Sequence, residues 1–445
     1  RGIELVYSTL DKLKARTAEL RHRRYVGLVP ITPLVALEGG LDSDDVYADP
    51  PSGEVNADKT MALSLYDVIT GYDRYIWMKK KIAVPQRKDG CRPIGIFNFN
   101  DGGGFEGVLY VDGKPYQGID SNHTEVLLDE FAGQEIELTI LLWSGVNGSG
   151  DKTPRRQKVN SAHVGYLSVD TDEYYYLART ICESADVMPH GSAERYATLR
   201  ALDESMLLVD WSDNEDEFYA SVKAALASLK VSLSRMEKHS AVTVAGVGHT
   251  HIDVAWLWRL KHTREKAIRS FATALRLMEE FPEFIFLQSQ PQLYKYIKND
   301  CPYIYEKIKK RVSEGRWEAD GAMWLEADCN ISSGEALARQ FLYGIRFFEE
   351  EFGVRCRHLW LPDAFGYSWA LPQLMKQCGI KTFMTTKISW NEVNRMPHNI
   401  FRWRGIDGTE VLTYFITTPT RGSYETATYN GYMDPYSAVG AWECF

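Results

Sequence analysis

The sequence predicts two fold types in one chain, an antiparallel β-sandwich followed by an α/β domain of parallel strands. Short alternating strands separated by turn residues run from about 72 to 170, a pattern typical of a sandwich. From residue 241 onward apolar strands alternate with helix-length segments. Parallel strands joined by helical crossovers have this alternation. A length of 445 residues is enough for about two to four domains.

The segments before and between these regions are expected to be helical or irregular. Residues 1–24 carry Leu, Ile and Val at the spacing of one amphipathic helix. Residues 30–60 are rich in Pro, Gly and Asp, which predicts a wrapping loop. We therefore divide the chain into an N-terminal helix and loop (1–60), a β-sandwich (61–170), a helical connector (171–240) and the α/β domain (241–445).

The sandwich is predicted from four apolar, β-branched and aromatic runs at 75–78, 94–97, 108–111 and 136–140. Asp112-Gly113 directly follows the third run and predicts a tight hairpin turn. Because an antiparallel sandwich closes its own core, we expect residues 72–170 to fold independently.

The α/β domain is predicted from shorter apolar runs that alternate with helical patterns. Strands are expected at 242–248, 284–288, 317–323, 357–361, 381–385 and 411–415. Helices are expected at about 263–280, 302–314, 333–351 and 369–377.

The end of the first of these strands carries a candidate metal-binding pair. Side chains alternate along an extended backbone, so His249, His251 and Asp253 point the same way. An imidazole and a carboxylate two residues apart can hold one divalent cation, typically Zn²⁺. The alternative is an ordinary strand end with hydrogen-bonded polar groups.

Asp363 is a second candidate acid. It follows the short strand predicted at 357–361, and α/β barrels place catalytic groups at such strand-to-loop junctions. Its alternative role is a helix N-cap or an Asx turn. The metal interpretation requires this carboxylate to meet His251 and Asp253.

Composition excludes several classes of function. A net charge of −9 argues against nucleic acid or an anionic membrane as a partner. No apolar run approaches the ~18 residues that a membrane span needs. The seven cysteines are scattered without a C-x-x-C pair, which predicts a reducing compartment and a cytoplasmic protein.

Five ordered motifs resemble the catalytic domain of glycoside hydrolase family 38, the α-mannosidases, and fit its bacterial and cytosolic branch best. They are Gly248 to Trp256, Phe286 to Gln290, Met323 to Asn330, Trp360 to Ser368 and Lys387 to Asn391. The resemblance implies a galactose-binding-like jelly roll followed by a seven-stranded (β/α) barrel. The sequence shows only part of that barrel, so we expect it to be incomplete at its C-terminal end.

The same resemblance implies a retaining, metal-dependent α-mannosidase that passes through a covalent mannosyl-aspartate. Asp363 matches the nucleophile and is also a metal ligand, together with His251 and Asp253. Zn²⁺ is the expected ion, and Co²⁺ fits the same nitrogen and oxygen donors. The expected substrates are mannose-containing oligosaccharides with terminal α-D-mannosyl residues.

Other residues match positions around the sugar. Trp256 and Phe365 match aromatic walls of the sugar site, with core packing as their alternative. Lys387 matches a cationic residue able to donate to sugar hydroxyls or to the nucleophile, with a solvated loop lysine as its alternative. Glu326 and Asp328 could line the same face or be solvent-facing loop acids.

The implied site has one position without a clear role and two missing groups. His249 resembles a position that is not a metal ligand, so hydrogen bonding behind the ligands is expected for it. The family's fourth ligand, a histidine, and its acid/base, an aspartate, have no matching position before Phe445. We therefore expect the chain alone to lack part of the catalytic set.

Two rival function classes remain open at this point. A metal-dependent carbohydrate deacetylase also uses His and Asp on an incomplete barrel, but it typically adds an H-x-x-x-H pair that this sequence lacks. A non-catalytic glycan-binding module is the other rival. The sequence does not specify the preferred mannosidic linkage or the oligomeric state. A homo-oligomer is one open alternative.

Overall fold

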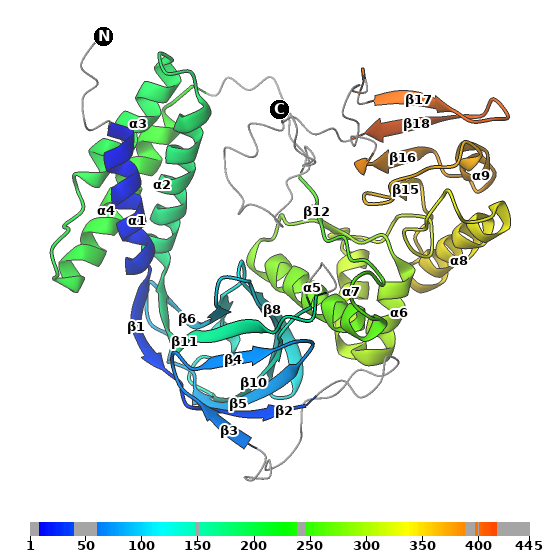
Figure 1. The fold of residues 1–445 in the computed structure, drawn as a ribbon. Helices are drawn as coiled ribbons and strands as arrows, with labels where there is room; N and C mark the ends of the chain where they lie inside the picture. Colours follow the sequence, from blue (N-terminus) through cyan, green and yellow to red (C-terminus); the bar gives the residue numbers. More distant parts are fainter. Residues whose placement is uncertain are drawn as a thin grey trace.

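The chain forms a helical bundle, a pair of antiparallel sheets and an α/β region (Figure 1). A computed structural model describes residues 9–39, 60–146, 151–237, 246–387, 397–398 and 400–415. In Figure 1 the antiparallel sheets lie between the helical bundle and the α/β region.

The helical bundle combines the N-terminal helix with the segment expected to be a connector. It contains α1 (Thr9–Arg23), α2 (Val169–Val187), α3 (Ala193–Met206) and α4 (Glu215–Ser234). Leu13 and Leu20 of α1 are buried in one cluster with residues of the other three helices. Ser192 and Asn214 cap α3 and α4 by accepting hydrogen bonds from backbone N–H groups. Helices are thus confirmed in the described part of both segments, and they share one core; residues 1–8 and 238–240 lie outside the described residues.

Eleven described strands form the two antiparallel sheets. The first sheet has the order β1-β11-β6-β9, and β4 also pairs with β11; the bounds are β1 (Tyr25–Pro30), β4 (Val68–Gly71), β6 (Cys91–Asn100), β9 (Glu125–Leu127) and β11 (Arg155–Ser168). The second sheet has the order β3-β2-β5-β10-β7-β8; the bounds are β2 (Leu34–Glu38), β3 (Thr60–Leu63), β5 (Tyr75–Ala83), β7 (Glu106–Val111), β8 (Lys114–Asp120) and β10 (Glu135–Trp143).

The four strands predicted for this region are confirmed, and so is the hairpin between β7 and β8. Asp112 and Gly113 both have positive φ, 47° and 78°, as a type I′ turn requires. One prediction was wrong, because residues 34–38 form β2 and pair with β5. Residues 40–59 of the expected wrapping loop lie outside the described residues. The jelly-roll assignment and the domain boundaries stay predictions.

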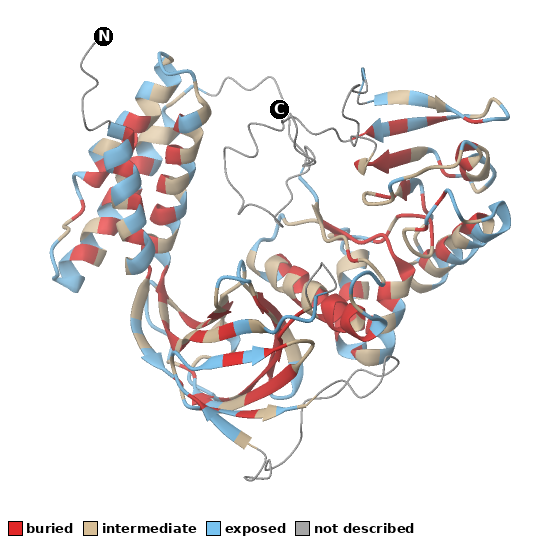
Figure 2. Ribbon diagram, viewed as in Figure 1, coloured by how far each residue is buried: buried red, intermediate tan, exposed pale blue. Residues whose placement is uncertain are grey.

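The six-stranded sheet is buried on both faces. Ile76, Met78 and Leu109 face the core between the two sheets. On the opposite face, Trp77 and Tyr110 pack into a cluster with helix α5 (Leu260–Glu280), which Figure 2 shows with a long buried stretch. The sandwich therefore does not close all of its own core. The reason we gave for independent folding of residues 72–170 is wrong.

The strands of the α/β region form two separate sheets. β12 (Gly248–His249), β13 (Phe286–Leu287) and β14 (Trp317–Glu318) are parallel. β15 (His358–Trp360), β16 (Thr382–Thr385) and β18 (Glu410–Phe415) are also parallel. β17 (Ile400–Arg404), which was not predicted, pairs antiparallel with β18. All six predicted strands are found at least in part, but most are shorter, and residues 241–245 lie outside the described residues.

Helices connect most of these strands. The expected helices are confirmed as α5, α7 (Pro302–Ser313), α8 (Gly334–Phe352) and α9 (Leu371–Gln377). Helix α6 (Pro291–Asp300) was not predicted. An aromatic cluster joins α5, α6 and β14, where Trp317 Nε1 donates to the hydroxyl of Tyr294 at 2.7 Å. Closure of the strands into a barrel stays a prediction. None of the helices in the described part of the chain has the length and apolar character needed to cross a bilayer.

Candidate active site

His251, Asp253 and Asp363 meet at the ends of two strands that are far apart in the sequence. His251 Nε2 lies 3.2 Å from Asp253 Oδ1 and 3.5 Å from Asp363 Oδ2. His251 and Asp253 lie in the loop after β12, and Asp363 follows β15. Among the described residues, these three form the group whose potential ligand atoms all lie within 4.8 Å of one another.

Two buried glutamines fix the loop that carries His251. Gln288 Nε2 donates to the carbonyl of Thr250 at 3.1 Å, and Gln290 Nε2 donates to the carbonyl of Ile252 at 2.9 Å. Both amides are buried, so they satisfy backbone carbonyls that water does not reach. The family resemblance identified the motif Phe286 to Gln290 in the sequence. Its hydrogen bonds to the loop of His251 are seen only in the structure.

Glu326 connects the two halves of the site. Its Oε1 accepts a hydrogen bond from His251 Nδ1 at 2.8 Å, and its Oε2 accepts one from the backbone N–H of Asp363 at 3.3 Å. The side chain is only 6% exposed. A carboxylate on Nδ1 fixes the ring and directs Nε2 toward the two aspartates, as carboxylates do behind metal-bound histidines. Of the alternatives open for Glu326, the structure favours the lining of the site.

The charge of the metal-free site depends on burial and on these contacts. Burial alone would lower the pKa of His251, but the charge of Glu326 and the hydrogen bonds that the ring donates to Asp253 and Glu326 raise that pKa to about 10. Burial also raises the pKa of Glu326, against the opposing charge of His251. The acids thus stabilise one positive charge at Nε2 of His251. Either a proton or a bound cation can supply that charge.

The residues present fit a divalent metal. Two ligand atoms that each lie ~2.1 Å from a tetrahedral ion are about 3.4 Å apart. The separations of 3.2 Å and 3.5 Å between His251 and the two aspartates match this value. One nitrogen and two carboxylate oxygens suit Zn²⁺ and Co²⁺.

His249 is not part of this ligand group. Burial lowers its pKa to about 4, so the ring is neutral. Its Nδ1 lies 3.0 Å from the carbonyl of Leu287, to which it donates, and its Nε2 accepts from Trp360 Nε1 at 3.3 Å. His249 therefore links β12 to β13 and β15 by hydrogen bonds, and its expected role behind the ligands stays a prediction.

Lys387 contacts the candidate nucleophile. Its Nζ lies 2.6 Å from Asp363 Oδ1, while the other carboxylate oxygen faces His251. The lysine follows β16, the strand next to β15. Of its two alternatives, the ion pair with Asp363 is the one seen. Residues 388–391 of the same motif lie outside the described residues.

The two aromatic candidates are exposed in the loops that carry the acids. Trp256 is 59% exposed and Phe365 is 74% exposed, so neither is a core residue in this structure. By contrast, Asp328 accepts backbone hydrogen bonds from Asn330 and Ile331, both at 2.8 Å. Asp328 is an exposed loop acid that caps a turn.

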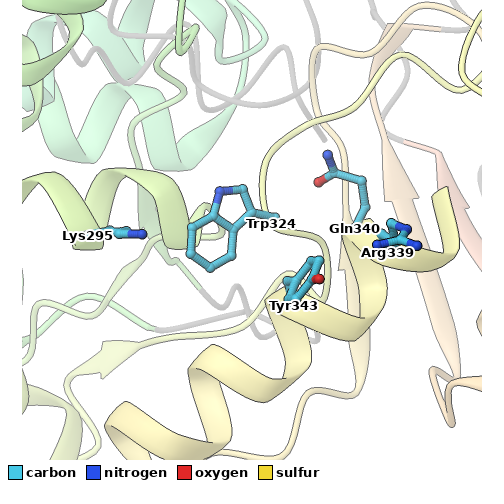
Figure 3. A pocket seen from close by; sticks show the side chains of 5 residues that line it. All are labelled: Lys295, Trp324, Arg339, Gln340 and Tyr343. Atoms are coloured by element: carbon cyan, nitrogen blue, oxygen red, sulfur yellow. The ribbon is translucent and has the colours of Figure 1, made fainter. Parts of the chain in front are cut away.

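A shallow hollow of about 300 Å³ lies elsewhere, near α6 and α8 (Figure 3). Its lining side chains are Lys295, Trp324, Arg339, Gln340 and Tyr343. None of them belongs to the candidate site, and Arg339 pairs with Glu335 at 2.8 Å. The hollow is therefore not the place where the acids and the histidine meet.

Comparison with known proteins decides the family. Residues 241–443 match the model of the glycosyl hydrolases family 38 N-terminal domain. These residues belong to this family. Over 362 residues it is 34% identical to "Alpha-mannosidase G" of Dictyostelium discoideum, which covers 78% of this chain and 33% of that protein.

Two further family 38 relatives show the same likeness. The human "Alpha-mannosidase 2C1" is 35% identical over 350 residues, covering 76% of this chain and 33% of that protein. "Alpha-mannosidase" of Saccharomyces cerevisiae is 45% identical over 179 residues, covering 40% of this chain and 16% of that protein. The chain thus spans about a third or less of the length of the family 38 relatives it matches.

Proposed function

We propose that this family 38 protein is a retaining, metal-dependent α-mannosidase that removes terminal α-D-mannosyl residues from oligosaccharides. The convergence of His251, Asp253 and Asp363 carries the proposal, because it supports a carboxylate nucleophile beside a candidate cation site. The names of the three relatives support the same class of reaction.

Asp363 is the nucleophile of the proposed reaction. One of its carboxylate oxygens attacks the anomeric carbon and forms a mannosyl-aspartate, while a second carboxyl protonates the departing oxygen and later activates water. Lys387 and His251 each contact one oxygen of Asp363, so they fix the direction of the carboxylate. The family resemblance assigns the second carboxyl to an aspartate downstream of the Asp363 segment.

His251, Asp253 and Asp363 would hold the metal. A bound divalent cation would act as a Lewis acid at the sugar and orient it through vicinal hydroxyls. The chain's own contribution is the orientation of these ligands, because Glu326 fixes the ring of His251 and contacts the backbone of Asp363. Zn²⁺ is the expected ion, and Co²⁺ suits the same donors.

Trp256 and Phe365 are proposed to pack against the sugar. Exposed aromatic rings cost free energy in water and gain it when they cover the apolar face of a pyranose. Their position in the two loops with the acids supports this role, which would explain why two large rings remain solvent-exposed.

The proposed location is the cytoplasm. None of the six cysteines in the described part of the chain forms a disulfide, which suits a reducing compartment. A jelly roll followed by a (β/α) barrel remains the proposed architecture, with two antiparallel sheets, one parallel sheet and one mixed sheet in support.

Hydrolysis of 4-nitrophenyl α-D-mannoside tests this proposal directly. We expect turnover by the full-length protein and loss of turnover in Asp363→Ala. Asp328→Ala is the control and should have near-normal turnover, because Asp328 is an exposed loop acid close in sequence to Glu326. A 5-fluoro mannosyl fluoride should label Asp363 covalently. Labelling of another acid would assign the nucleophile elsewhere.

The rival classes have their own readouts. Release of acetate from chitin oligomers without mannoside hydrolysis would support the deacetylase. Binding of mannose-containing glycans without turnover would support the glycan-binding module. Comparing the 445-residue chain with a protein several hundred residues longer tests whether the catalytic set extends beyond these residues.

A further inference from the structure

We propose that Asp73, a residue of the antiparallel sheets, is a positioning residue for the metal-binding loop of the α/β region. It lies in the turn between β4 and β5, and its proposed role is to hold the start of α5, which in turn holds the backbone of Asp253. The inference rests on the proposed function, because that function makes Asp253 a metal ligand.

Asp73 makes three side-chain contacts at the boundary between the two regions. Its Oδ2 lies 2.6 Å from Arg259 Nη2, and its Oδ1 lies 2.6 Å from His262 Nε2. The indole N–H of Trp143 also donates to Oδ1 at 3.1 Å. The Asp73 side chain is 19% exposed and that of His262 is 1% exposed. A hydrogen-bonded pair this well buried is costly to break from one side.

These contacts fix the first turn of α5. His262 Nδ1 accepts a hydrogen bond from the backbone N–H of Arg259 at 2.9 Å, so Nε2 carries the proton that is donated to Asp73. The His262 ring also stacks on Trp143 with 4.6 Å between ring centroids. A carboxylate beside a helix N-terminus is further stabilised by the helix dipole. Asp73 thus completes the N-terminal cap of α5 from another part of the fold.

The first turn of α5 then holds the metal-binding loop. Thr263 Oγ1 lies 2.5 Å from the carbonyl of Val254 and 3.3 Å from that of Asp253. Trp258 Nε1 donates to the carbonyl of Asp253 at 3.3 Å. Lys266 Nζ lies over the Trp258 ring, 4.5 Å from its centroid, and contacts Glu106 of β7 at 2.6 Å. A continuous series of contacts therefore runs from the antiparallel sheets to Asp253.

Asp73 can be changed without removing the rest of this boundary. Tyr75, Trp77 and Tyr110 remain packed in the cluster that they share with α5. Glu106 still pairs with Lys266 and Arg269. Replacing Asp73 should therefore loosen the start of α5 and the preceding loop while the two regions stay together.

The test compares Asp73→Ala and Asp73→Asn with Glu130→Gln in the full-length protein. Glu130 is an exposed acid that also pairs with α5, at Arg276 near its other end, so it controls for loss of an ion pair at the same boundary. Binding of Co²⁺ is measured by competition with a chelator. Amide hydrogen exchange of residues 253–259 is measured without metal, and kcat and KM are measured on 4-nitrophenyl α-D-mannoside.

We expect Asp73→Ala to weaken Co²⁺ binding by a few-fold, less than the ~10-fold or more expected when a group in direct contact with a metal ligand is removed. Exchange at 253–259 should become faster and kcat should fall. Asp73→Asn keeps an acceptor oxygen and should lie between Asp73→Ala and the unchanged protein. Glu130→Gln should match the unchanged protein in all three measurements.

Two failures are distinguishable. If the unchanged protein binds Co²⁺ and hydrolyses the mannoside, but Asp73→Ala and Asp73→Asn have normal Co²⁺ affinity and exchange, the positioning role is refuted and the function stands. If the unchanged protein neither binds Co²⁺ nor hydrolyses the mannoside, the proposed function fails and the inference fails with it. If Asp73→Ala does not fold, Asp73→Asn decides between these outcomes.

Discussion

Gly344 in α8 gives a sharp test of how the site is supported. Replacing glycine by alanine inside a helix normally stabilises a protein by about 1 kcal/mol. Here an added β-carbon would lie 2.2 Å from the carbonyl oxygen of Ala322 and 2.5 Å from the carbonyl carbon of Met323. Both are backbone atoms, so the helix and the 322–324 segment would have to move apart.

The expected outcome for Gly344→Ala is a net loss of stability. Overpacking a close contact costs typically about 1–3 kcal/mol, and a contact with rigid backbone belongs at or above the upper end of that range. After subtracting the gain in helix propensity, we expect a loss of about 2 kcal/mol. For a region of this size that corresponds to a melting temperature about 4–8 °C lower.

Gly334→Ala is the matched control, because Gly334 starts the same helix and a β-carbon there meets nothing within 4 Å. Its stability should stay within about 0.5 kcal/mol of the unchanged protein. Urea unfolding followed by tryptophan fluorescence measures both variants. The 322–324 segment leads to Glu326, so Gly344→Ala should also weaken Co²⁺ binding. Equal stability of the two variants would refute this account of the packing.

Three further predictions concern the site and its boundary. Glu326→Gln should weaken Co²⁺ or Zn²⁺ binding about 10–100-fold in a chelator competition; unchanged affinity would show that Glu326 does not orient the ligand. Trp256→Ala should raise KM for the mannoside and leave Co²⁺ affinity unchanged, whereas a lost metal would contradict its role at the sugar. Burial alone would raise the pKa of Asp73, but hydrogen bonds from His262 and Trp143 lower it to about 2. Because the folded pKa is depressed, about 2 kcal/mol of stability should be present above pH ~4 and lost as the pH falls toward 2. Urea unfolding at a series of pH values should show a shallower acid loss in Asp73→Asn, and identical acid profiles would contradict the assignment.

Sequence patterns predicted the helices and turns that depend on interactions between residues close in sequence. The helix periodicity of 263–280 and the Asp112-Gly113 turn both depend on neighbouring residues, and both were found. His251 and Asp363 each follow a predicted strand, and α/β barrels place functional groups at such strand ends; the two strands, β12 and β15, lie in separate sheets. These positions made the residues candidates, and the family resemblance assigned His251, Asp253 and Asp363 to one ligand group.

The rest depended on contacts between distant parts of the chain. Residues 34–38 form a strand that pairs with β3 and β5, and the Pro, Gly and Asp content of 30–60 hid the short apolar run Leu34 to Leu37. Helix α6 begins at Pro291, which suits a first helical position, but its ten residues were too short for a clear periodicity. Glu326 and Asp73 act through partners 75 and 189 residues away, so no spacing rule could identify their roles.

The burial of the six-stranded sheet on both faces has a consequence for how the protein unfolds. Tyr75, Trp77, Tyr110 and Trp143 all pack in the cluster shared with α5, and aromatic side chains bury about 150–250 Å² each. Detaching the α/β region would bare part of this area, an apolar patch on the order of several hundred Å² of a kind that monomeric proteins rarely expose. Calorimetry should therefore record the antiparallel sheets and α5 melting in one cooperative transition. A chimeric protein that carries the antiparallel sheets without α5 would need another apolar surface to cover these four aromatic side chains.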